Sequence, residues 1–284
     1  MEGLIIKNIS NDYTVKSDNN TYVCKARGKF KKDRIVPKVG DKVSFDEKTS
    51  YILNIHKRKN NLIRPSVSNI DQALVVTSVK KPDLDTNLLD KLLTIINYNN
   101  IEPIICFTKL DLLSSDEKKE INKYIDYYKK IGNKVITNEN KKNFEDLFKN
   151  KITVLAGQSG AGKSSLLNFL NPKLKLRTNE ISKALNRGKH TTRHTELYEL
   201  LDGYIVDTPG FSNIDFHDMQ QKDIRDNMKE MFDNLHDCKY RDCIHIKEDG
   251  CAVKKLVEDG IILQSRYKNY KQFIESVKTN KKKF

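Results

Sequence analysis

The sequence predicts a multidomain protein with an N-terminal β-barrel, a central α/β domain built around a phosphate-binding loop, and a C-terminal helical segment that binds a metal ion. Three observations lead to this prediction. Five short strand patterns fill the N-terminal part, strand and helix patterns then alternate around the segment GQSGAGKS, and three cysteines and a histidine cluster near the C-terminus. We expect the three domains to span residues 1–67, 68–218 and 219–284.

Length and charge limit the classes of function. The 284 residues are enough for two or three modest domains, and 52 Lys and Arg against 38 Asp and Glu give a net charge of +14. Such an excess attracts polyanions, which makes nucleic acid the expected partner, although a lysine-rich proteome would also explain it. No apolar run approaches the roughly 18 residues of a membrane span, and no signal peptide is recognisable. We therefore expect a cytoplasmic protein without a membrane partner, and by default a monomer.

The N-terminal domain is predicted from strand patterns separated by turn residues. Five short strands of this kind suit an OB-fold barrel, which often binds oligonucleotides. Residues 25–38 carry seven lysines and arginines around Phe30, a plausible RNA-contacting surface or simply a solvated basic loop. The expected strands are Leu4–Ile9, Tyr13–Lys16, Tyr22–Ala26, Lys42–Asp46 and Tyr51–Ile55.

The central domain is predicted from alternating patterns, which imply a parallel sheet covered by helices. Apolar runs of buried-strand length are separated by stretches with helical periodicity. The expected strands are Ala73–Ser78, Ile101–Phe107, Ile152–Ala156 and Tyr204–Val206, and the expected helices are Asn87–Asn97, Asp116–Lys130 and Lys163–Leu170.

A phosphate-binding loop follows the apolar strand 152–156 and precedes a helix pattern, which is the context that distinguishes a P-loop from a glycine-rich turn without a ligand. Its backbone N–H groups are expected to surround phosphate oxygens, with Lys163 at the β- and γ-phosphates and the Ser164 hydroxyl on Mg²⁺. The predicted nucleotide-binding residues here are Gly157, Gln158, Ser159, Gly160, Ala161, Gly162, Lys163, Ser164 and Ser165.

The segment Thr108-Lys109-Leu110-Asp111 predicts that the base is guanine. The Asp111 carboxylate is able to accept from both N1–H and the exocyclic amino group, which adenine does not offer. Lys109 is expected to lay its stem along the base, and Thr108 stands where asparagine is more usual. The next base-facing loop is expected at 136–138. Because these elements precede the P-loop instead of following it, the order of the parts is circularly permuted.

Two further elements follow the P-loop as usual. Asp207 and Gly210 belong to a D-x-x-G element, in which the aspartate holds Mg²⁺ through water and the glycine amide contacts the γ-phosphate. In the preceding basic loop we expect Thr192 to complete the Mg²⁺ shell, with Thr191 as the alternative. Phe211 occupies the position where Ras-like proteins place the water-orienting glutamine. We therefore predict His190 as the catalytic residue that positions water, against the alternative of an ordinary loop histidine.

A cluster of cysteines and histidine predicts one structural zinc ion. Three thiolates and an imidazole form a closed tetrahedral set that leaves no open position for catalysis. His236 is a rival ligand, and three buried free cysteines are the alternative interpretation. Cys24 and Cys106 fall in strand patterns and are expected in the core. The predicted ligands are Cys238, Cys243, His245 and Cys251.

Together, the motifs TKLD, GQSGAGKSSLLN, GKHTTRHTEL, DTPGF and CKYRDCIHIKEDGC resemble those of the circularly permuted GTPases of small ribosomal subunit biogenesis, the RsgA (YjeQ) family. The resemblance covers nearly the whole chain. It implies an OB-fold, a GTPase domain with the motif order G4-G5-G1-G2-G3 and a zinc-binding domain. It further implies GTP hydrolysis to GDP and phosphate with Mg²⁺, stimulated by the 30S subunit and its 16S rRNA near the decoding region. The family's switch histidine corresponds to His190.

Two other classes of function agree less well with these motifs. One is an RNA-binding or RNA-chaperone protein with a vestigial nucleotide site, which the intact Lys163, Ser164, Asp207 and Asp111 disfavour. The other is a permuted GTPase acting on the large subunit or at a membrane, which the zinc cluster, the barrel and the lack of an apolar anchor disfavour.

Overall fold

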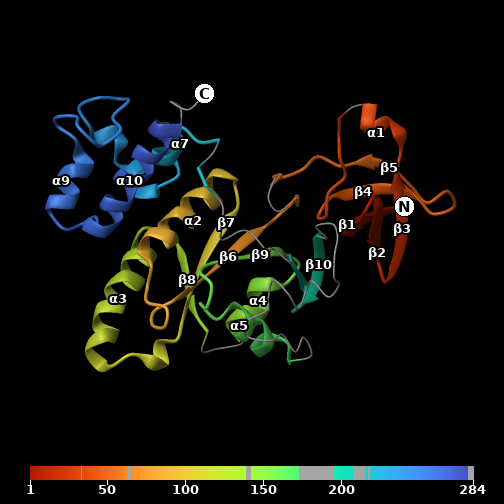
Figure 1. Ribbon diagram of the computed structural model, residues 1–284, viewed down its shortest axis with the longest axis horizontal. Coiled ribbons are helices and arrows are strands. Elements are labelled where there is room, and N and C mark those ends of the chain that lie inside the picture. The colour runs from red at the N-terminus through yellow and green to blue at the C-terminus, as the bar shows by residue number, and fades with distance from the viewer. Residues whose placement is uncertain are drawn as a thin grey trace. The chain divides into compact units, whose positions relative to one another are not determined.

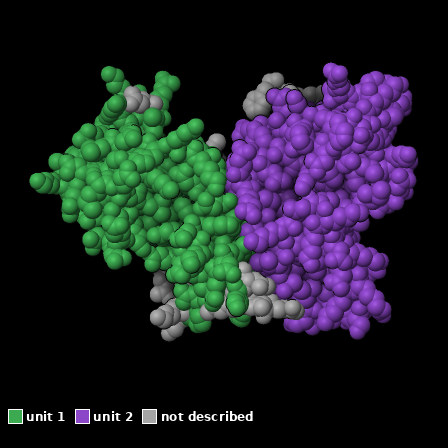
Figure 2. Space-filling model, turned by 180° about the vertical axis from the view of Figure 1, so that it is seen from behind, with its two compact units in different colours: residues 1–74, 139–155, 163–211 green, residues 75–138, 156–162, 212–284 purple. Residues whose placement is uncertain are grey.

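The computed structural model describes residues 1–32, 34–62, 66–138, 142–172, 195–206, 215–216 and 218–280, and the structural statements below concern these residues. They belong to two compact units, which Figure 2 colours separately. Unit 1 takes in residues 1–74, 139–155 and 163–211, and unit 2 takes in residues 75–138, 156–162 and 212–284.

The N-terminal part of unit 1 is a closed five-stranded barrel (Figure 1). Its strands pair in the order β1-β2-β3-β5-β4, and β4 returns to pair with β1, which is the connectivity of an OB-fold. The predicted barrel is thus confirmed, and the short helix α1 (Gly28–Lys32) is an addition within the basic segment. The strands are β1 (Glu2–Ile9), β2 (Asp12–Ser17), β3 (Asn20–Ala26), β4 (Lys42–Asp46) and β5 (Tyr51–Ile55).

Alternating side chains of these strands fill the barrel interior. Ile5, Val15, Cys24, Phe45 and Ile52 are fully buried, as the period-two pattern of each strand requires. Burial of Cys24 agrees with its predicted place in the core.

A buried carboxylate fastens the segment that leaves the barrel. Asp41 is fully buried and accepts two hydrogen bonds from Arg58, at 2.7 and 2.8 Å. The Ser68 hydroxyl donates to the same carboxylate at 2.6 Å, and the Lys38 N–H does so at 2.7 Å. Because a buried charge is stable only when paired and hydrogen-bonded, this cluster holds the connecting segment against the barrel.

The rest of unit 1 extends the sheet beyond the barrel. β1 pairs with β10 (Thr195–Leu200), which forms a hairpin with β11 (Gly203–Val206), and β11 lies parallel to β9 (Ile152–Ala156). The predicted parallel sheet therefore continues into an antiparallel strand, β10, which was not predicted from the sequence. The physical reason is the two-residue turn Leu201-Asp202, whose φ values of 50° and 56° fit a type I′ hairpin. Helices α4 (Lys142–Phe148) and α5 (Lys163–Leu170) complete this part.

Unit 2 contains the other strands of the α/β fold, packed with two helices. The strands β6 (Gln72–Ser78), β7 (Glu102–Thr108) and β8 (Lys134–Thr137) are neighbours in that order, with the first three residues of β6 in unit 1. Helix α2 (Thr86–Tyr98) begins where Asp85 accepts from the Leu88 N–H at 2.9 Å. Helix α3 (Ser115–Lys130) begins with a capping box of Ser114 and Glu117, after the short 3₁₀ turn η1 (Leu110–Leu112).

The C-terminal part of unit 2 is helical around an irregular centre. A buried cluster that includes Met228, Met231, Tyr270 and Ile274 packs with Ile95 of α2. No described helix is both long and apolar enough to cross a lipid bilayer. The elements are α7 (Gln221–Asp226), α8 (Lys229–Asp233), η4 (Leu235–Asp237), α9 (Ala252–Glu258) and α10 (Gln264–Asn280).

A buried ionic network joins these helices to α2 and α3. Arg266 of α10 is 4% exposed and donates to Asp90 of α2 at 2.5 Å and to Glu230 of α8 at 2.6 Å. The hydroxyls of Tyr128 and Tyr127 donate to these two carboxylates, at 2.6 and 2.8 Å respectively. Every charge in the network therefore has an opposite charge and further hydrogen bonds, as burial requires.

Candidate nucleotide site and metal centre

The P-loop begins with a glycine that no other residue can replace. Gly157 has a φ of 125°, and a Cβ built on it would lie 2.0 Å from the carbonyl oxygen of Val76. Only a residue without a Cβ adopts this backbone at such a close approach. Gly160 and Gly162 also have positive φ values, so the loop has the left-handed turns that aim successive N–H groups inward.

The guanine motif is hydrogen-bonded to the P-loop within unit 2. Thr108 ends β7, and its hydroxyl donates to the carbonyl oxygen of Ala161 at 2.7 Å. The Lys109 ammonium donates to the carbonyl oxygen of Gly160 at 2.9 Å and also to that of Lys81. Two motifs about fifty residues apart in the chain are thereby held side by side, in the arrangement that a single nucleotide bound to both would need.

The carboxylate predicted to read the base is available to a ligand. Asp111 lies in η1, and its exposed side chain makes no hydrogen bond or ion pair with a described residue. The neighbouring helix start is fixed instead by Glu117, which accepts from Lys80 at 2.8 Å through both oxygens. The ion pair with Lys80, together with hydrogen bonds from Ser114, lowers the pKa of Glu117 to about 2. Asp111 thus lies in a short turn between two anchored segments. Thr108 and Lys109 bind the P-loop before it, and Glu117 binds Lys80 after it.

The charged and hydroxyl groups of the P-loop stand at the start of α5. Burial lowers the pKa of Lys163 to about 8, because removal from water disfavours the charged ammonium. Ser164 is 5% exposed, whereas Ser165 is exposed. Within the loop Gln158 is half-buried and Ser159 exposed. A bound phosphate group would restore the usual preference of Lys163 for the charged form.

Several predicted residues lie outside the described part of the chain. These are the D-x-x-G residues Asp207 and Gly210, with Phe211 after them, and the loop residues His190, Thr191 and Thr192. In contrast, one residue of the site was not predicted from the sequence. This is Lys81, whose backbone carbonyl accepts a hydrogen bond from the Lys109 ammonium. No side-chain pattern marks a backbone acceptor, so nothing in the sequence could have identified it.

The structure brings the four predicted metal ligands together. The ligand atoms of Cys238, Cys243, His245 and Cys251 all lie within 4.8 Å of one another. The Cys238 and Cys251 sulfurs are 4.0 Å apart, and the Nδ1 atom of His245 lies 3.5 and 3.3 Å from them. A tetrahedral zinc site with ordinary bond lengths has S–S edges of about 3.8 Å and S–N edges of about 3.6 Å. The donor set and its spacing therefore fit a tetrahedral metal ion.

Hydrogen bonds around the cluster favour the ligand role of Nδ1. The Nε2 atom of His245 lies 3.0 Å from the carbonyl oxygen of Met231, so Nε2 carries the proton and Nδ1 keeps its lone pair. Burial and the neighbouring thiols raise the pKa of Cys243 to about 12. A cation would reverse that preference and stabilise thiolates. The rival ligand His236 is exposed and faces Asp237 at 3.4 Å instead.

Side chains hydrogen-bond to backbone groups of the metal-binding loop, residues 238–251, both from within the loop and from α10. The Glu248 carboxylate accepts from the N–H groups of Ile244, Ile246 and Lys247, which together lower its pKa to about 2 against the effect of burial. From α10, the hydroxyls of Tyr267 and Tyr270 each donate at 2.7 Å to carbonyl groups of this loop. The ligands are thus preorganised by second contacts around them.

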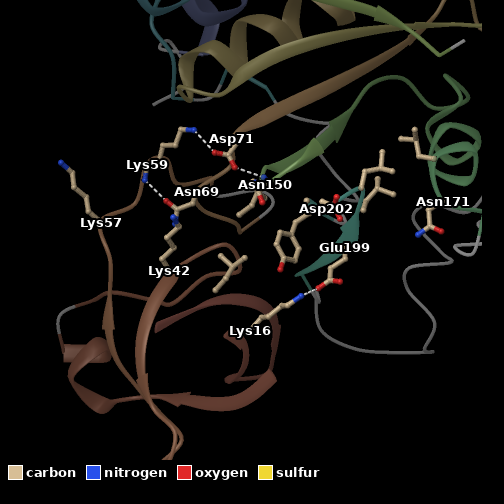
Figure 3. A pocket seen from close by; sticks show the side chains of 17 residues that line it. Lys16, Lys42, Lys57, Lys59, Asn69, Asp71, Asn150, Asn171, Glu199 and Asp202 are labelled. Atoms are coloured by element: carbon tan, nitrogen blue, oxygen red, sulfur yellow. Dashed lines mark hydrogen bonds and ion pairs between the residues drawn. The ribbon is translucent and has the colours of Figure 1, made fainter. Parts of the chain in front are cut away.

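A large cleft lies within unit 1, between the barrel and the strands β9 and β11. It has a volume of about 900 Å³ and is lined by four lysines and three carboxylates, as Figure 3 shows. Lys16 is paired with Glu199, and Lys59 with Asp71 at 3.0 Å. Lys42 and Lys57 are exposed and form no ion pair with a described residue. Two ammonium groups are therefore exposed at the cleft, and that of Lys57 extends away from the other lining side chains in Figure 3.

Comparison with known proteins agrees with this geometry. The RsgA N-terminal domain matches residues 2–52, and the RsgA GTPase domain matches residues 55–217. The chain belongs to the RsgA family of circularly permuted GTPases. The family assignment confirms the resemblance inferred from the motifs.

Among its relatives, "Small ribosomal subunit biogenesis GTPase RsgA 2" of Oceanobacillus iheyensis is 46% identical, covering 100% of this chain and 99% of the relative. RsgA 1 of Listeria monocytogenes serotype 4b is 47% identical over the full length of both. The solved structure of YloQ, a circularly permuted GTPase, superposes with a TM-score of 0.83 at 37% identity, over 98% of this chain and 95% of that one. YjeQ of Thermotoga maritima gives 0.83 at 34% identity, over 97% and 98%.

Proposed function

We propose that the protein hydrolyses GTP to GDP and phosphate during late maturation of the 30S ribosomal subunit, and that the subunit stimulates the reaction. The observation that carries the proposal is the set of hydrogen bonds from Thr108 and Lys109 to the P-loop. They join the guanine motif to the phosphate motif even though the chain presents them in reversed order. Membership of the RsgA family, whose relatives are named for small-subunit biogenesis, supplies the biological setting.

The proposed division of labour follows from the chemistry of each group. Asp111 selects guanine, and Lys163 offsets negative charge on the transferring phosphoryl group. Magnesium ion, bound with the nucleotide through Ser164 and Thr192 (or Thr191), would neutralise further phosphate charge. Asp207 and Gly210 belong to the same phosphate end, and His190 positions the attacking water.

We assign zinc to the four-residue cluster, in a structural role. Three thiolates and one imidazole are soft ligands that select zinc over magnesium, and four protein ligands leave no position for a substrate. We place the three domains at residues 1–67, 68–218 and 219–284. The last of these, which holds the metal cluster, would act as a rigid accessory to the GTPase domain.

The 16S rRNA is the proposed contact on the subunit. The net charge of +14 supports it, as do the exposed Lys42 and Lys57 in the cleft of Figure 3. Ribosomal subunits mature in the cytoplasm, which is where we place the protein, acting as a monomer.

Turnover measurements test the proposal. GTP hydrolysis is followed at physiological salt with the protein alone, with 30S subunits and with 50S subunits as the control. We expect strong stimulation by 30S subunits alone. Tight 30S binding without stimulation by either subunit would support an RNA-binding protein with a vestigial site instead.

Release after hydrolysis is a separate part of the proposal. The affinity of the protein for 30S subunits is measured with GDP and with a non-hydrolysable GTP analogue. We expect the analogue to give the tighter complex, because the γ-phosphate orders the loop between P-loop and D-x-x-G element. Equal affinities would exclude a role of hydrolysis in release.

A further inference from the structure

We propose that Thr108 prevents this protein from recognising the N7 atom of guanine, so that N7 contributes nothing to nucleotide affinity. The inference rests on the proposed GTP-binding function and deepens it, because it names the atoms of the base that the site distinguishes.

The hydroxyl proton of Thr108 is already committed. The side chain is 2% exposed, and its oxygen lies 2.7 Å from the carbonyl oxygen of Ala161 and 3.3 Å from that of Thr77. Both neighbours are acceptors, and a hydroxyl has only one proton to donate. The proton therefore goes to the P-loop, and what remains on Thr108 is acceptor capacity.

Guanine needs the opposite from this position. Its N1–H and amino donors meet the Asp111 carboxylate, so the edge that carries N7 faces back toward the end of β7, where the motif begins. N7 and the adjacent O6 are acceptors, which only a donor can recognise. Thr108 has no donor left, and two of the three protons of the Lys109 ammonium go to the carbonyl groups of Gly160 and Lys81, which hold this group at the P-loop.

The usual asparagine would act differently at this position. A carboxamide has two N–H protons, so one is able to hold the Ala161 carbonyl while the other reaches N7. Thr108 therefore keeps the positioning contact with the P-loop and omits the contact with the base. Thr108 is a positioning residue, and its identity also decides whether the N7 atom of guanine is contacted.

A single-atom change in the ligand tests this inference. The full-length protein with Mg²⁺ is titrated with GDP and with 7-deaza-GDP, in which a C–H group replaces N7. For the natural protein we expect affinities within about twofold of each other. The Thr108→Asn variant is expected to prefer GDP by about fivefold, the ordinary effect of one added hydrogen bond.

Two control variants separate recognition from structure. Thr108→Ser keeps the hydroxyl and should bind both nucleotides as the natural protein does. Thr108→Val loses the bond to Ala161, so it should bind both more weakly by the same factor, with the ratio unchanged. A purely structural role would move the affinities and leave the ratio untouched in every variant, including Thr108→Asn.

A preference of the natural protein for GDP of fivefold or more would overturn the inference, as would an unchanged ratio in folded Thr108→Asn. If Thr108→Asn does not fold, the ratio for the natural protein decides alone. Failure of the natural protein to bind either nucleotide would instead contradict the proposed function, so the two failures are distinguishable.

Discussion

The metal cluster and the guanine motif lie in the same unit, but different interactions hold them. The cluster gathers four side chains from residues 238–251, a stretch with little regular structure, and burial raises the pKa values of Cys243 and Cys251. The guanine motif ends a buried strand and is fixed by hydrogen bonds from Thr108 and Lys109 to backbone carbonyls. We therefore expect the first region to depend on a bound metal ion for much of its stability, whereas the second is held by hydrogen bonds of the chain itself.

Removal of the metal should give the largest effect. Cys251→Ser, or chelation of the natural protein, is expected to unfold the segment around residues 238–260, since structural zinc contributes about 10 kcal/mol or more in isolated zinc-binding peptides. Hydrogen exchange of α9 and of the metal-binding loop measures this.

His236→Ala is the matched control for metal removal, because this neighbouring histidine is exposed and outside the cluster. Its exchange should equal that of the natural protein. Full protection of the loop in Cys251→Ser would contradict the structural role of the metal.

The buried network that joins the helices of unit 2 should give the next largest effect. Arg266→Ala leaves Asp90 and Glu230 buried without a positive partner, which should lower the free energy of unfolding by about 3–5 kcal/mol. Chemical denaturation measures the change. Lys119→Ala is the control, since its pair with Asp116 is exposed and is worth less than about 1 kcal/mol. Equal effects of the two substitutions would show that the network contributes no special stability.

Much of this arrangement could be predicted from the sequence. Strand and helix positions followed from the spacing of apolar residues, and the P-loop and the metal cluster followed from short motifs whose residues are close in the chain. The pairing of Asp90 with Arg266 spans 176 positions, and no local pattern announces it. The antiparallel strand β10 was not predicted, because the left-handed φ values of its turn fall on Leu201 and Asp202, and the glycine of the Asp202-Gly203 turn signal already begins the next strand.

Base selection should respond to one carboxylate without any change in the fold. Asp111→Asn replaces an acceptor pair by one acceptor and one donor, so GDP affinity should fall about 100-fold or more and xanthosine diphosphate, with a carbonyl in place of the amino group, should bind better than GDP. Calorimetric titration with both nucleotides measures this. Because Asp111 is exposed and unpaired among described residues, the midpoint of thermal unfolding should stay the same. Retained preference for GDP would mean that another group reads the base.

The pH dependence of nucleotide binding should give the smallest effect. Burial lowers the pKa of Lys163 to about 8, and bound phosphates raise it, so nucleotide binding takes up a proton at pH values between the two pKa values. Affinity for GDP is therefore expected to fall as pH rises above 8, by at most tenfold per pH unit. Calorimetry from pH 7 to 9.5 measures this. An affinity that stays constant to pH 9.5 would show that the ammonium is charged in the free protein.

The role of the P-loop as the catalytic centre is tested most directly by Lys163→Ala, assayed for both 30S binding and 30S-stimulated GTP turnover. We predict retained binding to 30S subunits and a loss of turnover of at least about 100-fold, because the ammonium group that offsets phosphate charge is gone. Turnover close to that of the natural protein would contradict the claim that this P-loop is the catalytic centre.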